Sequence, residues 1–172
     1  MIFITVLLIV TNYKNTDFKE TDFSDVREKA KRFFQPLENE KGMDPDALVH
    51  ELQKILFPVD VLIIMSEPQL KNALDRILTL KEERLPSLKA TDVRTLIKVK
   101  ETQTMMLSAE MTLRASMMRK ETRENIFYRD DYNKADNRNW LKWIIAEKGH
   151  DGEIEFSTSD IPLEKYQFKP DV

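Results

Sequence analysis

The sequence predicts a mainly α-helical protein: a bundle of three to four helices with one long central helix and minor β structure at the N- and C-terminal ends. Apolar residues recur at intervals of three and four in several segments, the spacing of a helix that buries one face. Prolines stand where these segments stop. One stretch, from Val93 to about Asn125, contains neither glycine nor proline. With 172 residues, 41% of them hydrophobic, the chain can bury a sizeable core.

Residues 1–10 form an apolar run rich in β-branched side chains, which predicts a buried β-strand. The alternatives are a remnant of a membrane or signal segment and a segment that packs on a partner. A membrane span needs about 20 residues, and no basic region or small-residue cleavage site of a signal peptide is visible. Residues 11–24 are polar and predict a linker, in which Asp22 or Ser24 can cap a helix over residues 25–34.

A second helix is expected to begin after Asp44, because an aspartate before Pro45 is a favourable cap followed by a favourable first residue. Pro58 stops it. The apolar residues 59–65 then predict a strand or an extended buried connection. The buried stripe expected on this helix consists of Leu48, Val49, Leu52, Ile55 and Leu56.

A third helix is expected to start at residues 66–68, where Ser66 precedes Pro68, and to end at Pro86. Its polar residues alternate with an apolar stripe, so one face should lie in water and the other in the core. That stripe consists of Leu70, Ala73, Leu74, Ile77 and Leu78.

The longest helix is expected from Val93 to about Asn125, with Thr91 and Asp92 as caps. At 1.5 Å per residue its length is roughly 50 Å, so it must be packed along most of its length. Its methionines indicate core packing, or alternatively a contact surface for another chain, because Met adapts to irregular neighbours. Small side chains between them would let another helix approach closely. The methionines are Met105, Met106, Met111, Met117 and Met118.

After the long helix the pattern changes to short elements. Residues 128–139 predict a charged loop, and residues 140–146 a short helix or strand. A turn is expected at residues 149–152, a strand at 153–157 and an extended tail at 161–172. The expected domains are therefore an apolar strand and linker over 1–24, a helical bundle over 25–146, and an extended tail over 147–172 that packs on the bundle.

Composition excludes several kinds of site. There are only three glycines, and none of them form the cluster that a dinucleotide fold or a P-loop needs. The absence of Cys excludes disulfides and thiolate-held iron–sulfur clusters. A net charge of -3 does not favour nucleic acid as a partner. Glu147 and His150 have a di-iron spacing, but the second pair is missing and Gly149 interrupts the helix, so no metal site is expected.

Four arginines follow the long apolar segment, and this is the most unusual stretch of the chain. They are Arg114, Arg119, Arg123 and Arg129. Arg119 and Arg123 are four residues apart, so they share a face of a helix. Glu110 stands four residues before Arg114, and an acidic residue in this position before a basic one stabilises a helix. Arginine makes bidentate bonds to carboxylates at interfaces. The alternative is a surface network of ion pairs, which would contribute little to stability.

Three segments in this region resemble a known family. Residues 108–123 read SAEMTLRASMMRKETR, residues 128–132 read YRDDY, and residues 139–143 read NWLKW. Their order and spacing resemble the C-terminal helical domain of the fumarate reductase/succinate dehydrogenase/adenylylsulfate reductase flavoproteins, most closely the adenylylsulfate reductase-like branch. The resemblance covers residues 44–143 and extends in outline from 25 to the end.

The chain departs from the family pattern at three positions. Glu124 stands where many members have glycine after the Glu-Ser/Thr-Arg motif, and Tyr128 stands where many have histidine. Asn133 replaces the proline that follows the tyrosine. Any site that requires the histidine is therefore not expected here.

The resemblance implies a helical bundle that packs against an FAD-binding domain, which this chain lacks. The expected partner is a flavin-binding domain or subunit, with an iron–sulfur subunit as a further candidate, and the expected location is cytoplasmic. FAD would be held by the partner, this chain would hold no cofactor or metal, and the isolated chain would be inactive. The residues that the resemblance assigns to docking are Arg114, Arg119, Glu121, Arg123, Arg129 and Asp131.

Two other interpretations remain open at this point. The chain can be a free-standing helical interaction module that no longer serves redox chemistry, or a non-functional remnant. A flavin-containing partner that co-purifies would favour the docking interpretation over both.

Overall fold

The computed structural model describes residues 23–123 and 127–167, and the chain divides into two compact units, residues 1–35 and 36–172. The strand expected over residues 1–10 lies outside the described residues, as does the linker expected over 11–24 up to residue 22. In the first unit, helix α2 spans Phe23–Phe34. It begins two residues before the expected start at Asp25, so Ser24 lies inside the helix and does not cap it.

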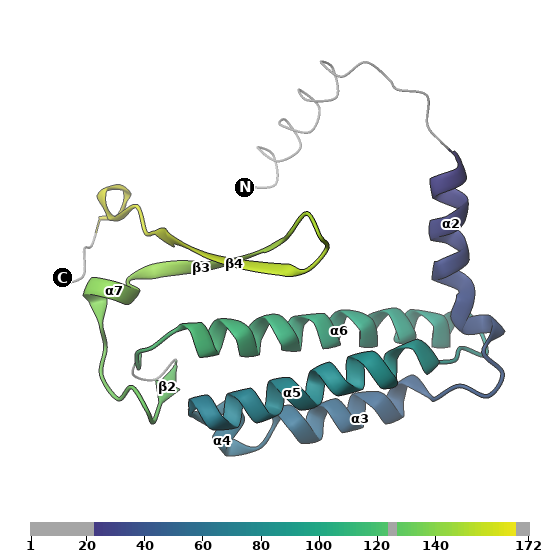
Figure 1. Ribbon diagram of the computed structural model, residues 1–172, viewed down its shortest axis with the longest axis horizontal. Helices are drawn as coiled ribbons and strands as arrows, with labels where there is room; N and C mark the ends of the chain where they lie inside the picture. Colours follow the sequence, from purple (N-terminus) through teal and green to yellow (C-terminus); the bar gives the residue numbers. More distant parts are fainter. Residues whose placement is uncertain (1–22, 124–126, 168–172) are drawn as a thin grey trace, which may run out of the picture. The chain divides into compact units, whose positions relative to one another are not determined.

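Three long helices form the body of the second unit: α3 (Pro45–Leu56), α5 (Glu67–Glu83) and α6 (Val93–Met118). They lie side by side, each in contact with the other two (Figure 1). The mainly α-helical fold with a long central helix is therefore confirmed. Short 3-10 helices flank them at Gln35–Glu38 and Leu85–Ser87.

Aspartates begin two of these helices as the sequence predicts. The side chain of Asp44 accepts a hydrogen bond from the Asp46 amide at 2.8 Å, and that of Asp92 accepts one from the Thr95 amide at 2.7 Å. Each bond satisfies an amide that has no partner within the helix. Among the core residues that the three helices bury completely are Leu48, Leu70, Ile77, Val99 and Met106.

The segment expected to be a strand or an extended buried connection, residues 59–65, begins instead as a helical turn. Helix α4 spans Val59–Leu62, and strand β1 covers only Ile64–Met65. Pro58 explains this turn, because its fixed φ of -54° suits the residue before a helix. The segment is also mostly exposed: Leu62 is 57% exposed and only Met65 is buried.

Helix α6 ends at Met118, seven residues before the expected end at Asn125. Arg119 adopts an extended conformation with ψ of 112°, so the chain leaves the helix axis there. It returns as β2 (Tyr128–Arg129), which pairs in parallel with β1 and places Met65 opposite Arg129. The expected loop over 128–139 therefore contains a strand and the start of a short helix, α7 (Asn137–Trp140).

An antiparallel hairpin completes the unit: β3 (Lys142–Lys148) pairs along its length with β4 (Ile154–Asp160). The expected turn at residues 149–152 joins the strands, and Gly152 has the left-handed φ of 92° that favours glycine. A 3-10 helix, Leu163–Lys165, interrupts the expected extended tail. The division expected between residues 146 and 147 falls inside β3, because cross-strand pairing continues to Lys148. In the described part of the chain, no helix is long and apolar enough to cross a membrane.

Candidate docking site

The C-terminal end of α6 is held by a fully buried arginine. Arg129 Nη1 donates hydrogen bonds to the carbonyl oxygens of Ser116, at 2.6 Å, and Arg119, at 3.2 Å. The last carbonyl groups of a helix have no partners within it and carry partial negative charge. The guanidinium therefore satisfies these groups and places positive charge where the helix dipole favours it. This contact explains why α6 stops at Met118 although no glycine or proline ends it.

Arg129 also forms a bidentate ion pair with Asp131. Its Nε and Nη2 atoms each lie 2.7 Å from a carboxylate oxygen of Asp131. Asp131 Oδ2 in turn accepts a hydrogen bond from the Glu67 amide at the start of α5, at 2.8 Å. Ser66, expected to cap α5, makes no such bond with its side chain. Asp131 thus takes the role of the cap, and the pair joins the end of α6 to the start of α5.

The hydrogen bonds from the Arg129 guanidinium are the main reason that the pKa of Asp131 is lowered from its ordinary value. The amide of Glu67 acts in the same direction, while burial opposes both. Asp131 is therefore held in its charged form at neutral pH, as both contacts require.

A second buried carboxylate, Glu121, organises the chain just after α6. It is completely buried and accepts hydrogen bonds from Arg119, at 2.5 Å, and Arg123, at 2.9 Å. Its other oxygen accepts a bond from the Asp136 amide at 3.0 Å. Because every carboxylate oxygen has a donor, the cost of burying this charge is offset.

The two arginines extend the network to the following elements. Arg119 donates to the carbonyl oxygens of Trp140, at 2.8 Å, and Lys142, at 2.9 Å, at the start of the hairpin. Arg123 Nη1 donates to Asn137 Oδ1 at 2.6 Å, next to the N-terminus of α7. Nη2 of Arg123 is buried and has no hydrogen-bond partner among the described residues.

Arg114 belongs to a separate cluster one turn earlier. Together with Lys81 of α5 it binds Glu110, which is 1% exposed: the Arg114 Nη2 distance is 2.8 Å and the Lys81 Nζ distance is 2.7 Å. Burial alone would raise the pKa of Glu110, but the hydrogen bonds from Lys81 and Arg114 outweigh it and lower that pKa. The sequence reveals the i, i+4 pair of Glu110 and Arg114. It does not reveal the contact between Lys81 and Glu110, because these two residues are 29 positions apart.

The structure thus brings five of the six expected docking residues together at the end of α6 and places Arg114 apart from them. Arg129 and Glu121 are completely buried, so they contact only this chain's own residues in the structure described. Arg119, Arg123 and Asp131 keep 19%, 27% and 28% of their side-chain surface exposed. Among the six expected docking residues, only these three and Arg114, which is 37% exposed, have side-chain surface available for a direct contact with a partner.

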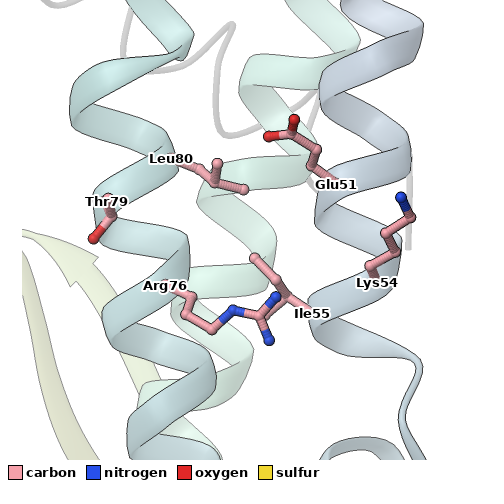
Figure 2. Close-up of a pocket in the computed structure, with 6 residues that line it drawn as sticks. All are labelled: Glu51, Lys54, Ile55, Arg76, Thr79 and Leu80. Atoms are coloured by element: carbon pink, nitrogen blue, oxygen red, sulfur yellow. The ribbon is translucent and has the colours of Figure 1, made fainter.

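A small hollow lies between α3 and α5 on the outside of the bundle, with a volume of about 300 Å³. Figure 2 shows Arg76 of α5 extending toward Ile55 of α3, with Glu51 and Lys54 along the same wall. No group of three or more potential metal ligands occurs in the described part of the chain. Glu147 and His150 lie on a strand and in a turn, where the helical Glu-x-x-His geometry is absent.

Comparisons with known proteins agree on one kind of relative. A family model described as the fumarate reductase flavoprotein C-terminal region matches residues 50–172. Among curated proteins no sequence matches the chain. The solved adenylylsulfate reductase from the hyperthermophilic Archaeoglobus fulgidus is 24% identical with a TM-score of 0.76, over 87% of this chain and 26% of that chain.

Two further solved structures are similar. The Mycobacterium smegmatis Sdh1 complex is 25% identical with a TM-score of 0.67, over 84% of this chain and 25% of that chain. The E. coli quinol fumarate reductase is 18% identical with a TM-score of 0.70, over 90% of this chain and 27% of that one. The chain therefore spans about a quarter of the length of the solved chains it matches.

Proposed function

Because the chain belongs to the fumarate reductase flavoprotein C-terminal family, we propose that it is the helical module of a flavoprotein oxidoreductase that docks on a flavin-binding domain and is not catalytic alone. The observation that carries the proposal is that the family model matches residues 50–172. The chain covers only about a quarter of the length of the solved relatives. The missing three quarters of such chains would have to come from another domain or polypeptide.

Within the described residues, the starts of the three long helices do not favour the pyrophosphate of FAD. Phosphate groups bind at helix N-termini, where free amides and the helix dipole attract them. Here the three long helices each have an aspartate at that end: Asp44 for α3, Asp131 for α5 and Asp92 for α6. Their negative charge would repel a pyrophosphate. FAD is therefore assigned to the partner, where the flavin would carry out the electron transfer.

The proposed role of this chain is to support the partner. The Arg119–Glu121–Arg123 and Arg129–Asp131 contacts hold residues 119–123 and 129–131 in place, so that the partly exposed guanidinium groups of Arg119 and Arg123 have defined positions. Arg114, Arg119, Glu121, Arg123, Arg129 and Asp131 are proposed as docking residues in this sense. The buried members position the loop, and the partly exposed members contact the partner.

The other proposed assignments follow from the same role. The partner is a flavin-binding domain or subunit, and an iron–sulfur subunit is a further candidate. The proposed location is the cytoplasm. The proposed reaction is an oxidation or reduction, and the assembled flavoprotein would carry it out.

The test is co-expression of the full chain with the flavin-binding polypeptide encoded in the same genome, followed by affinity purification of the chain. We expect a yellow complex in which mass spectrometry finds a polypeptide related to the first three quarters of the solved relatives. The chain alone should be colourless and inactive. A colourless chain recovered alone from the co-expression would contradict the proposal and favour a free-standing interaction module.

A further inference from the structure

A large apolar groove lies between α3 and α6, and Phe127 also lines it. Its volume is about 630 Å³, roughly twice that of the hollow between α3 and α5. All the residues that line it belong to the unit of residues 36–172. A groove of this size would hold several large apolar side chains, whereas isolated monomers seldom leave such a surface open to water.

The floor and the rim of the groove differ in a way that favours a docked segment. The α6 side of the floor carries small side chains, Ser108, Ala109 and Thr112, so another backbone can approach closely. The rim carries large apolar side chains that lie in water: Leu62 is 57% exposed and Met105 is 47% exposed. An apolar segment in the groove would cover the rim and fill the space above the floor.

The groove is continuous with the candidate docking site. A second hollow of about 460 Å³ shares Thr112, Ser116 and Phe127 with it. That hollow is also lined by Arg119 and by Trp143 of the hairpin, which is 47% exposed. One partner surface can therefore lie along the groove and reach the guanidinium of Arg119 at its end.

We propose that this groove is where the flavin-binding polypeptide seats an apolar segment, with the arginine end of α6 as the polar margin of the same interface. The inference rests on the proposed function and adds the location of the interface and the chemistry of what fills it. The occupant is assigned to that polypeptide for two reasons. The chain spans only a quarter of its solved relatives, and the groove continues into the residues assigned to docking.

Two substitutions on α6 form a matched test. Met105 lines the groove and is 47% exposed, whereas Leu107 is 42% exposed and does not line it. The two positions are separated by two residues, or about 200° around the helix. In complexes with the flavin-binding polypeptide, Met105→Glu should raise the dissociation constant at least tenfold, because binding would bury a carboxylate in an apolar groove. Leu107→Glu should change it less than twofold.

Both variants are melted first, and each should unfold within a few degrees of the original chain because both positions are exposed. A measurement without substitutions supports the comparison: dilute hydrogen peroxide should oxidise Met105 in the free chain and much less in the complex. If Met105 is already protected in the free chain, then a second copy or another part of the same chain fills the groove, and the inference is wrong.

The outcomes separate this inference from the proposed function. If no flavin-binding polypeptide associates with the original chain, the proposed function fails and the groove assignment fails with it. If the complex forms but Met105→Glu binds as tightly as the original chain, or no more weakly than Leu107→Glu, only the groove assignment is overturned. The Arg-containing end of α6 would then be the remaining candidate for the interface.

Discussion

Two of the charged residues after α6 are buried and their partners are partly exposed, and this difference determines what each of them can contribute. Glu121 and Arg129 are completely buried, and every nitrogen or oxygen atom at the end of their side chains has a hydrogen-bond partner. Truncating one member of such a pair leaves an uncompensated charge, which is far more costly than losing an exposed ion pair. The alternative interpretation of these arginines as a weak surface network therefore does not apply to Arg129.

Arg123 gives a residue-level prediction. Arg123→Ala removes one of the two guanidinium groups on buried Glu121 and the bond to Asn137. The free energy of unfolding should fall by about 1–3 kcal/mol, the usual range for a hydrogen bond to a charged group. Urea denaturation measures it. The control is Arg138→Ala at an exposed position, which should change the value by less than about 0.5 kcal/mol. Equal effects of the two variants would contradict the structural role.

The pH dependence of stability tests Asp131. Its pKa in the folded chain is lowered from the ordinary value of 3.8, mainly by Arg129, so the folded state binds fewer protons than the unfolded state in this range. This contribution to stability is complete above about pH 5 and is lost as the pH falls through 3.8 and below. Asp131→Asn should remove that part of the acid dependence, and denaturation at several pH values from 7 to 3 measures it. An unchanged acid profile in the variant would show that Asp131 does not contribute to it.

The sequence identified these arginines and acids as unusual but could not assign their partners. Arg119 bonds to carbonyl groups 21 and 23 residues away, and Asp131 bonds to an amide 64 residues away. Local spacing reveals only pairs within one helical turn, such as Glu110 and Arg114. The remaining contacts depend on where the loop after α6 folds, and no short-range pattern records this.

At the level of elements, starts were predicted more accurately than ends. Asp44 and Asp92 are caps whose action is local, so α3 and α6 begin where the sequence predicts. The end of α6 is set instead by Arg129, which captures the carbonyl groups of Ser116 and Arg119 from outside the helix. Residues 119–123 contain no helix breaker, and so their sequence alone favours a longer helix.

The connection before α3 gives an element-level prediction. A Cβ atom at Gly42 would overlap the carbonyl oxygen of Ser87, a backbone atom that pairs with the amide of Met43. Gly42→Ala should therefore reduce the free energy of unfolding by about 1–3 kcal/mol, as overpacking does. Gly149→Ala is the control, because its Cβ would meet mainly the ends of the Glu155 and Asp151 side chains, which can move. Thermal or urea unfolding compares the two, and a larger loss for Gly149→Ala would contradict this account.

For the whole molecule, the sequence predicted the mainly α-helical fold with its long central helix, and it predicted the family, because the helical periodicity and the motif over residues 108–143 are both local patterns. It did not predict the groove between α3 and α6. The floor residues Ser108 and Thr112 and the rim residue Leu62 become one surface only when the helices pack. The sequence predicted core packing for the methionine-rich segment, and Met106 is buried. A contact surface for another chain was the alternative, and it stays a prediction for Met105, which is 47% exposed.

The pair of Arg129 and Asp131 has a consequence for how the chain is made. During translation, the residues of α5 and α6 are added before residues 129 and 131, so the pair that joins the ends of these helices can form only after both helices have been synthesised. At about 5–20 residues per second, this interval is on the order of a second. A nascent chain that stalls within it would present unsatisfied amides and carbonyls at neighbouring helix ends.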